Sequence, residues 1–453
     1  MGSPGPSHLK VPARHPRPAR FSEDALAVEF ARRYANELRF TTSTGQWHIW
    51  NGHYWEEDST CLVIERIRQI CRAEGSACKD PHLKRRLASH RTINAVERLA
   101  RTDPDIAVRA DRWDRNPWLL NTPGGVVDLR TGRTCPGDRQ DNLTMCTAVG
   151  PSGECPLWHS FLSKITDGDH ELQLFLQRIS GYALSGSTQE HALFFLYGTG
   201  ANGKSVFLNT LSGLMGEYAR TAPMGAFSAT RNERHPTELA GLKGARLVTA
   251  TETEEGRYWD EPKIKAITAG DPISARLMRQ DFREYLPQFK VMIAGNHKPG
   301  LRNINEAMIR RLHFIPLLKT IPISQRDLRL FEKLHSEWPG ILQWMINGCL
   351  AWQMEGLNPP QLVREATATY LESEDLVGQW LAECCNFEPA ASSATGELFR
   401  NYSAWCQMRS QNPRSHRSFS LELEARGFAL ARSNRQRRLI GLRLVTHVTH
   451  GSN

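Results

Sequence analysis

The residues best suited to chemistry form one short stretch, Gly198–Ser205, with the sequence GTGANGKS. This is the GxxxxGK(S/T) spacing of a phosphate-binding loop, and it stands between the apolar run Ala192–Tyr197 and the helix-like segment Val206–Met215. Glycines permit a tight turn in which consecutive N–H groups and a helix N-terminus point at phosphate oxygens. A Gly-rich turn could match the pattern by chance, but its place between a strand and a helix favours a nucleoside triphosphate site.

Two side chains of this loop have specific tasks. Lys204 can reach the terminal phosphates, and the Ser205 hydroxyl can ligate Mg²⁺. We therefore expect ATP and Mg²⁺ as cofactors. The predicted nucleotide-binding residues are Gly198, Thr199, Gly200, Ala201, Asn202, Gly203, Lys204 and Ser205.

Polar residues end two later apolar strands. Arg246–Thr251 is followed directly by Glu252 and then Glu254, and an acid at a strand end next to a phosphate loop can hold Mg²⁺ and polarise the attacking water. Glu252 is the first choice, and a solvated acidic loop is the alternative. Gln288–Gly295 ends on Asn296, whose amide can orient water or sense the γ-phosphate, although an isolated Asn at a strand end is more often a turn former.

Between these two strands, Lys263–Arg283 predicts a helix followed by a β-hairpin. The hairpin would project Arg276, Arg279 and Phe282. A basic projection with an aromatic tip suits a nucleic-acid backbone.

Adjacent arginines precede the next strand in Ala307–Pro316. An arginine offered across a subunit boundary would stabilise transition-state charge on a neighbour's nucleotide, and Arg311 or Arg310 could serve. A surface arginine pair without this role would look the same in isolation.

Composition restricts the class of protein. The chain has 453 residues, 40% of them hydrophobic and 23% charged, and no run approaches the about 18 apolar residues of a membrane span. The N-terminus lacks the apolar core of a secretory signal. Ten cysteines occur without CxxC pairs, which favours unbridged thiols in a reducing cytoplasm.

The net charge is +9, and both ends are basic. Residues 1–20 contain Lys and Arg but no acid, and residues 432–443 are rich in arginine and also lack acid. Basic ends suggest a polyanionic partner, although a solvated surface would have the same composition.

The hydrophobic pattern divides the chain into five segments, with an α/β core that contains the phosphate loop. We predict a disordered basic tail at 1–20, an α+β domain at 21–153, the core at 154–325, a helical region at 326–390 and a winged-helix-like domain at 391–453.

In the first domain, Gln46–Trp55 predicts a β-hairpin around Asn51-Gly52. Its three tryptophans could form a base-stacking platform, but cross-strand packing is the commoner reason for such residues. Helices are expected at 58–77 and 83–101, and short strands joined by turns at 121–133. No catalytic constellation is evident in this domain.

Near the C-terminus, helices precede two alternating segments, 427–432 and 438–445, which predict a two-stranded ribbon. A wing carrying Arg435, Arg437 and Arg438 would suit phosphate contacts. A small packing domain with a solvated arginine turn fits the pattern equally well.

Taken in order, these motifs resemble the superfamily 3 helicases, and most closely the phage and plasmid primase–helicase family related to the poxvirus primase–helicase. The resemblance covers most of 21–445. The segments that carry it are GTGANGKS at 198–205, TETEEG at 251–256, TAGDPISAR at 268–276, GNHKP at 295–299, IRRL at 309–312 and NTPGGVVDLRTG at 121–132.

The resemblance implies an AAA+-type core assembled into a hexameric ring, with nucleotide between subunits and single-stranded DNA in the central channel. It also implies 3′→5′ translocation and the cytoplasm of a bacterial host. Many relatives carry a primase domain ahead of the helicase, so we expect priming to be absent or to come from a separate chain. The implied roles are phosphate and Mg²⁺ contact for Lys204 and Ser205, Walker B acid for Glu252 or Glu254, sensor 1 for Asn296, arginine finger for Arg311, and channel hairpin for Arg276–Arg279.

The sequence therefore predicts an ATP-dependent DNA helicase of mobile-element replication. The alternative is a nucleotide-switched origin-binding or helicase-loading module without unwinding activity. Glu252 and an arginine acting in trans argue against it, because both serve hydrolysis. A small-molecule kinase is disfavoured by the basic hairpin and the arginine-rich tail.

Overall fold

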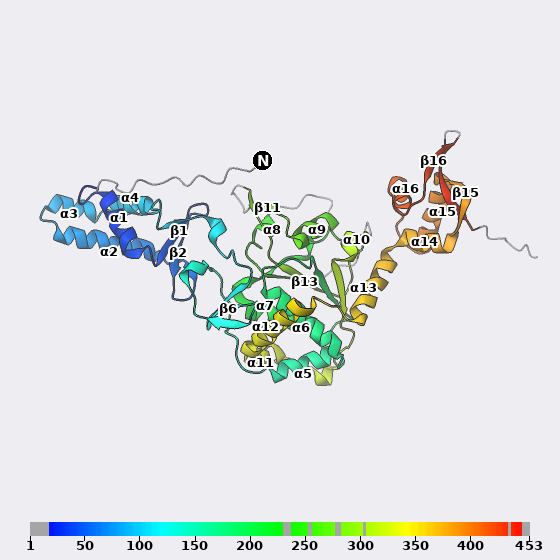
Figure 1. Ribbon diagram of the computed structural model, residues 1–453, viewed down its shortest axis with the longest axis horizontal. Helices are drawn as coiled ribbons and strands as arrows, with labels where there is room; N and C mark the ends of the chain where they lie inside the picture. Colours follow the sequence, from blue (N-terminus) through cyan, green and yellow to red (C-terminus); the bar gives the residue numbers. More distant parts are fainter. Residues whose placement is uncertain are drawn as a thin grey trace, which may run out of the picture.

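The computed structural model describes residues 18–229, 237–251, 256–276, 282–301, 305–433 and 436–445, so most of the predicted tail lies outside it. Three bodies follow one another along the long axis (Figure 1). An N-terminal body precedes a central body built on a parallel sheet, and one long helix leads to a C-terminal body. Within the described residues no helix combines the length and apolar character needed to cross a membrane.

The N-terminal body packs helices against a small sheet of order β3-β2-β1-β4. Its core includes Leu26, Phe30, Ile67 and Val96. The helices are α1 (Glu23–Tyr34), α2 (Leu62–Ala77), α3 (Pro81–Leu87) and α4 (His90–Ala100), and the strands are β1 (Leu38–Thr41), β2 (Gln46–Trp50), β3 (Trp55–Glu57) and β4 (Ala107–Val108).

The predicted hairpin around Asn51-Gly52 is confirmed, since β2 and β3 pair antiparallel. The packing interpretation of its tryptophans is confirmed as well. Trp55 is buried, and Trp47 packs against Phe30 and Phe40 while its Nε1 donates to Glu97 Oε1 at 2.7 Å. These rings therefore serve the core rather than a base-stacking platform.

A second small sheet joins this body to the centre. It contains β5 (Leu119–Thr122), β6 (Gly125–Asp128) and β7 (Arg133–Cys135), as the turn-rich sequence predicted. Leu120, Val127 and Leu129 belong to the hydrophobic core of the central body rather than to that of the N-terminal helices. The segment 21–153 is thus divided between two cores.

The central body is a five-stranded parallel sheet of order β14-β8-β13-β10-β9. Its central strands are continuous apolar runs because helices cover both faces. The strands are β8 (Leu193–Tyr197), β9 (Ala219–Thr221), β10 (Leu247–Thr251), β13 (Lys290–Gly295) and β14 (Leu312–Pro316).

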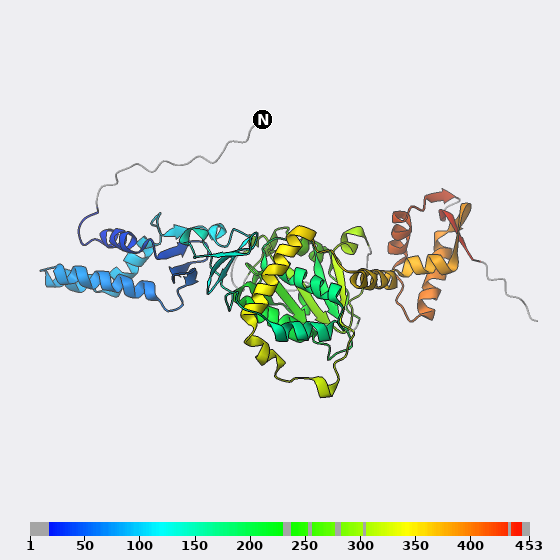
Figure 2. The ribbon, with the colours of Figure 1, turned by 60° about the horizontal axis from the view of Figure 1, so that its bottom comes forward.

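Alternate residues of each strand enter different cores. Phe194 and Leu196 face one core, whereas Leu193 and Phe195 face the other. The first core is covered by α5 (Pro156–Ile165), α6 (His170–Leu184), α7 (Lys204–Met215), α11 (Leu330–His335) and α12 (Trp338–Glu355). Figure 2 looks onto this face, with α12 crossing in front of the sheet.

The opposite face carries α8 (Thr237–Ala240), α9 (Glu261–Ala269) and α10 (Glu306–Ile309). After α9, strands β11 (Ile273–Ala275) and β12 (Arg283–Tyr285) pair antiparallel, which confirms the predicted helix and hairpin. The residues between these strands, 277–281, lie outside the described part of the chain.

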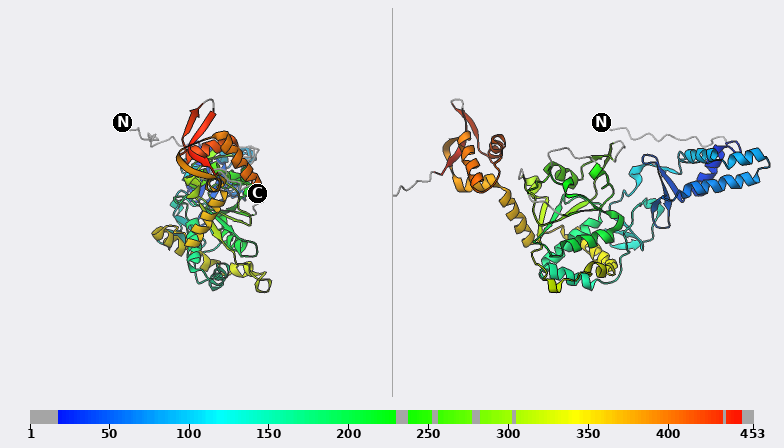
Figure 3. Two further views of the ribbon diagram at one scale, coloured as in Figure 1. Left: turned by 90° about the vertical axis from the view of Figure 1, so that its right-hand side faces the viewer. Right: turned by 180° about the vertical axis from the view of Figure 1, so that it is seen from behind.

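The helix α13 (Gln361–Glu374) leads to the C-terminal body, whose strands form the upright ribbon in Figure 3. Its sheet has the order β15-β17-β16, and the predicted ribbon is confirmed by the pairing of β16 with β17. The elements are α14 (Leu376–Cys384), β15 (Cys385–Ala394), α15 (Thr395–Met408), α16 (His416–Ala425), β16 (Leu430–Ser433) and β17 (Gln436–Leu444).

The boundary that we predicted between residues 390 and 391 falls inside β15 and is misplaced. Val377 and Trp380 of α14 pack with Leu398, Tyr402 and Phe419, so this body begins near residue 376. Its order of helix, strand, two helices and two strands is that of a winged helix.

Candidate nucleotide-binding site

The loop from β8 to α7 has the backbone of a phosphate cradle. Gly200 and Gly203 have φ of 101° and 82°, and Ala201 between them has φ of 50°. The helix α7 begins at Lys204, and its N-cap Gly203 makes no side-chain capping bond. The N–H groups of the first turn therefore remain available to an anion at the positive end of the helix.

Close packing accounts for two of the glycines. A Cβ on Gly203 would lie 2.4 Å from Ile165 Cγ2, and one on Gly198 would lie 2.1 Å from Leu317 O. Both distances are far below van der Waals contact. The loop can hold this shape only with glycine at these positions.

Lys204 is almost fully buried, with 6% of its surface exposed. Its Nζ donates to Gly198 O at 2.8 Å, to Asn202 Oδ1 at 2.9 Å and to Asn296 Oδ1 at 3.3 Å. Burial lowers the pKa of Lys204. The ammonium is thus fixed beside the loop by neutral acceptors.

A cavity of about 580 Å³ opens beside this ammonium, lined by Lys204, Ser205, Asn209, Thr251, Ala294, Gly295 and Asn296. These residues come together because β8, β10 and β13 are parallel neighbours, so their carboxyl ends meet at one edge. Thr251 is opposite Ala294, and Gly295 is opposite Tyr197, where the loop begins.

The predicted acids Glu252 and Glu254 lie outside the described residues. Thr251, which directly precedes them, lines the cavity. Asn296 also lines it and contacts Lys204, so the predicted sensor and phosphate-binding residues share one site.

The segment after β14 holds the phosphate loop in place through hydrogen bonds. The sequence did not predict these contacts. Asn202, buried to 2% exposure, donates through Nδ2 to Leu317 O at 2.7 Å. Ile321 N donates to Ala201 O at 2.9 Å. Asn209 was missed too, although it lies four residues after Ser205 on α7, on the same helical face.

The loop that follows Asn296 is tied to α13. Tyr370 donates through its hydroxyl to Pro299 O, and Glu374 Oε2 accepts from Leu301 N at 2.9 Å. Lys298 Nζ stands 3.8 Å from the centre of the Tyr197 ring. These contacts connect the strand end at the cavity to the helix that leads to the C-terminal body.

The two predicted finger arginines differ in environment. Arg311, our first choice, is 5% exposed and donates to Thr268 Oγ1 at 3.0 Å and to Ala307 O at 2.6 Å. Its guanidinium is therefore held inside its own subunit. Arg310 is exposed.

The candidate DNA-binding residues lie away from the cavity. Arg276 is exposed at the end of β11, with its guanidinium 4.8 Å from the centre of the Phe282 ring, and Phe282 is 55% exposed. In the ribbon, Arg437 is exposed, whereas Arg438 donates to Ser392 Oγ at 2.9 Å. Arg279 and Arg435 lie outside the described residues.

Two sequence families match the chain. A family described as "D5 N terminal like" matches residues 27–167, and a family of unknown function (DUF5906) matches residues 196–311. The first match covers the N-terminal body from within α1, the small sheet and α5, and the second runs from the end of β8 to just before β14 and includes the cavity.

Individual relatives are viral proteins. A protein of Acanthamoeba polyphaga mimivirus named as a "putative helicase" is 26% identical over 321 residues, which is 64% of this chain and 33% of that protein. A protein of Frog virus 3 (isolate Goorha) with the same description is 23% identical over 274 residues, or 55% of this chain and 28% of that protein. The chain thus spans about a third of the length of these relatives.

Solved structures share the fold along nearly the whole chain. The apo C-terminal region of NrS-1 has a TM-score of 0.52 at 8% identity, covering 93% of this chain and 99% of that one. A second form of it has a TM-score of 0.51 at 9% identity, covering 92% and 98%. The likeness shows that the chain has the α/β fold of this region.

Proposed function

Because the chain is related to the phage and viral primase–helicases, we propose that it is an ATP hydrolase that unwinds DNA in replication. It would work as a ring of subunits, with nucleotide bound at each boundary and single-stranded DNA in the centre. ATP and Mg²⁺ would be its cofactors and a hexamer its assembly. The 3′→5′ direction of movement follows from the resemblance alone.

One observation carries the proposal. Three neighbouring parallel strands end around a single cavity, bringing together the phosphate loop, the residue before the predicted acid and Asn296. A strand order of β14-β8-β13-β10-β9, with the phosphate loop after the second strand, fits the AAA+-type core that the resemblance implies.

The residues at this edge suit a triphosphate with its metal. Lys204 and the free N–H groups at the start of α7 would hold phosphate oxygens, and the close packing at Gly198 and Gly203 fixes the shape of the loop. Ser205 and Glu252 would hold Mg²⁺, with Glu254 as the second choice of acid. When bound, the metal would neutralise charge on the phosphates.

Three side chains of the protein would then have separate roles in hydrolysis. Lys204 is already desolvated and placed by Gly198 and Asn202, so little reorganisation remains when phosphate arrives. Asn296, the most distant of its three acceptors, would release the ammonium and orient the attacking water. Arg310 would supply positive charge from the adjacent subunit, since the guanidinium of Arg311 already donates hydrogen bonds to Thr268 and Ala307.

DNA would be moved by the hairpin of β11 and β12. Arg276 and Phe282 are exposed beside each other, just after β11 and just before β12, and with Arg279 they would contact the strand in the channel. Arg437, with Arg435 and Arg438, would add backbone contacts from the C-terminal ribbon.

The test is ATP hydrolysis with and without single-stranded DNA, run beside unwinding of a forked duplex. DNA-stimulated turnover with strand separation supports the proposal. Turnover without separation, even when partner proteins are supplied, would favour the nucleotide-switched loading or origin-binding module. No turnover in any condition would contradict enzymatic function.

A further inference from the structure

The short helices α3 and α4 carry a concentration of positive charge that the nucleotide site does not use. Residues 79–98 contain six Lys or Arg and two acids. All six cations are exposed, and they are Lys79, Lys84, Arg85, Arg86, Arg91 and Arg98. We call the surface formed by Arg85, Arg86, Arg91 and Arg98 the α3–α4 basic face.

Helical spacing places these arginines on the solvent side of their own helices, and only residues 88 and 89 separate α3 from α4 in the chain. In α4, Thr92, Val96 and Ala100 are buried at intervals of four, while Arg91 and Arg98 follow the opposite stripe through Asn94. In α3, Leu87 is buried, and Arg85 and Arg86 lie three and four residues after His82. Both helices therefore turn their cations away from the core.

Neither nearby acid neutralises this face. Asp80 is the N-cap of α3, where its Oδ1 accepts from His82 N at 2.9 Å. Glu97 is buried and accepts from Trp47 Nε1 and Arg101 Nε. Within the described part of the chain, ion pairs of this body go to other arginines, namely Arg32, Arg33, Arg66, Arg68, Arg72, Arg101 and Arg109.

Helix stability does not explain the whole arrangement. Arg85 and Arg86 occupy the last turn of α3, where a cation is favoured by the helix dipole. Arg91 is in the first turn of α4, which contains no acid, and there the dipole opposes a cation. This position disfavours the helix locally, as residues retained for binding often do.

We propose that the α3–α4 basic face binds the phosphate backbone of duplex DNA. Residues 79–98 contain no Phe, Trp or Tyr, so bases of a single strand would find no ring on which to stack. Cations fixed on two packed helices suit a rigid double strand, which carries one charge per about 1.7 Å of its axis. The contact is independent of sequence because it reaches phosphates alone.

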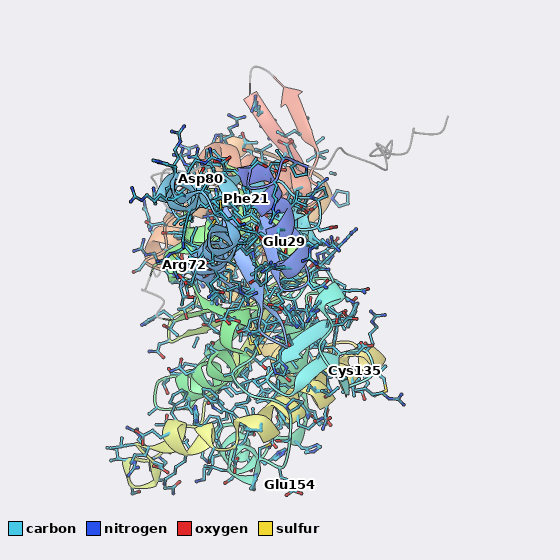
Figure 4. The ribbon with its side chains drawn as sticks, turned by 90° about the vertical axis from the view of Figure 1, so that its left-hand side faces the viewer. Phe21, Glu29, Arg72, Asp80, Cys135 and Glu154 are labelled. Atoms are coloured by element: carbon cyan, nitrogen blue, oxygen red, sulfur yellow. The ribbon has the colours of Figure 1, made fainter. Side chains whose placement is uncertain are left out.

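This surface is separate from the proposed DNA channel. Figure 1 places α3 at one end of the long axis, with the parallel sheet and the β11–β12 hairpin in the middle. Figure 4 looks onto that end, where Asp80 and Arg72 mark α3 and α2. The face would hold the duplex portion of a fork while the central body acts on the single strand, so it extends the proposed function without depending on hydrolysis.

The experiment compares two triple variants of the full chain without nucleotide. One changes Arg85, Arg86 and Arg91 to Ala, and the control changes Arg32, Arg33 and Arg68 to Ala. Both remove three positive charges from the same body, but the control arginines are paired with Glu29 or Glu65. Binding of labelled duplex and of single-stranded oligonucleotides is measured by anisotropy at several salt concentrations.

We expect the first variant to bind duplex about tenfold more weakly and its slope of log K against log salt to flatten by about 2 to 3. Its binding of single strands and its hydrolysis of ATP should stay close to wild type. The control should keep the duplex slope. A third variant with Lys at the same three positions should also keep it, which separates lost charge from lost folding.

Equal slopes for the two Ala variants would overturn the proposal, as would a wild-type chain that does not bind duplex. A loss confined to single strands would also overturn it. None of these results decides whether the cavity hydrolyses ATP, because that activity is measured separately and in the absence of DNA.

Discussion

The two ends of the parallel sheet both contain buried cations, but they use them differently. At the carboxyl end, Lys204 lies beside the cavity and is held partly by the side chains of Asn202 and Asn296. At the amino end, Arg246 and Lys290 are each 1% exposed at the starts of β10 and β13.

The amino-end cations are surrounded by main-chain carbonyls. Arg246 donates to Leu184 O at 2.7 Å and to Leu119 O at 2.6 Å, with its guanidinium 4.5 Å from the Tyr218 ring centre. It therefore fastens the small sheet and the end of α6 to the central strands. Lys290 donates to Ser185 O, to Ser187 O and to Gln288 O.

This difference indicates that Lys204 is placed to bind a ligand, whereas Arg246 and Lys290 stabilise the fold. Carbonyls of ordered segments cannot move aside, and neither Arg246 nor Lys290 lines the cavity. The amide of Asn296 can rotate away, and the space beside Lys204 can admit an oxyanion. The following changes test whether the two ends are as distinct as their contacts suggest.

The largest effect is expected for Lys204→Ala. Turnover should fall to background, because the positive charge facing the phosphates is lost. The free energy of unfolding should change little, since Lys204 itself borders a cavity that water can enter. Steady-state hydrolysis and urea unfolding, followed by tryptophan fluorescence, measure the two quantities. Normal turnover would place the phosphate site elsewhere.

Next in size is Arg310→Ala, which should lower turnover by about a thousandfold while nucleotide binding is retained. Arg311→Ala should instead destabilise the subunit by about 1 to 3 kcal/mol, because Thr268 and Ala307 lose a buried donor. Mixing each variant with wild-type subunits shows whether the arginine acts across a boundary. If Arg311→Ala alone poisoned the mixture, the assignment of the finger would return to Arg311.

At the amino end, Arg246→Met should lower the free energy of unfolding by about 3 kcal/mol, since two buried carbonyls lose their donor. Turnover of the protein that remains folded at low temperature should stay within about twofold of wild type, because the change is at the far end of the sheet from Lys204. Urea unfolding and hydrolysis at 10 °C check both parts. A loss of turnover without a loss of stability would contradict a purely structural role.

The carboxyl end could be predicted from sequence because its signals are local. The GTGANGKS spacing identifies Lys204 and Ser205 without a fold, and Asn296 follows from its place after an apolar strand. Glu252 and Glu254 stay predictions, because they lie outside the described residues. What the spacing cannot give is the strand order that brings Thr251 and Asn296 to one cavity.

The amino end could not be predicted, because its cations look like surface residues in the sequence. Arg246 and Lys290 stand next to apolar strands, and only the approach of Leu119, Leu184 and Ser185 from distant segments encloses them. The burial of Arg311 beside exposed Arg310 has the same origin, since Thr268 comes from α9. The winged-helix boundary was misplaced because α14 packs with residues more than 15 positions later.

The smallest effect tests the two lysines directly. Burial, aided by the nearby positive charge of Arg246, lowers the pKa of Lys290 well below its ordinary value in the folded protein. The unfolded chain therefore binds more protons between that lowered pKa and about 10.5, so stability due to this group rises with pH in that window.

The difference in unfolding free energy between wild type and Lys290→Met should accordingly increase as the pH rises from that lowered pKa towards about 10.5, with a slope of at most about 1.4 kcal/mol per pH unit. Lys204→Met is the matched comparison, since burial also lowers the pKa of Lys204 but its ammonium borders the cavity. Its pH slope should be shallower. Equal slopes would mean that water reaches both lysines to the same degree. The distinction between the carboxyl and amino ends of the sheet would then rest on the hydrogen-bond partners of the two lysines alone.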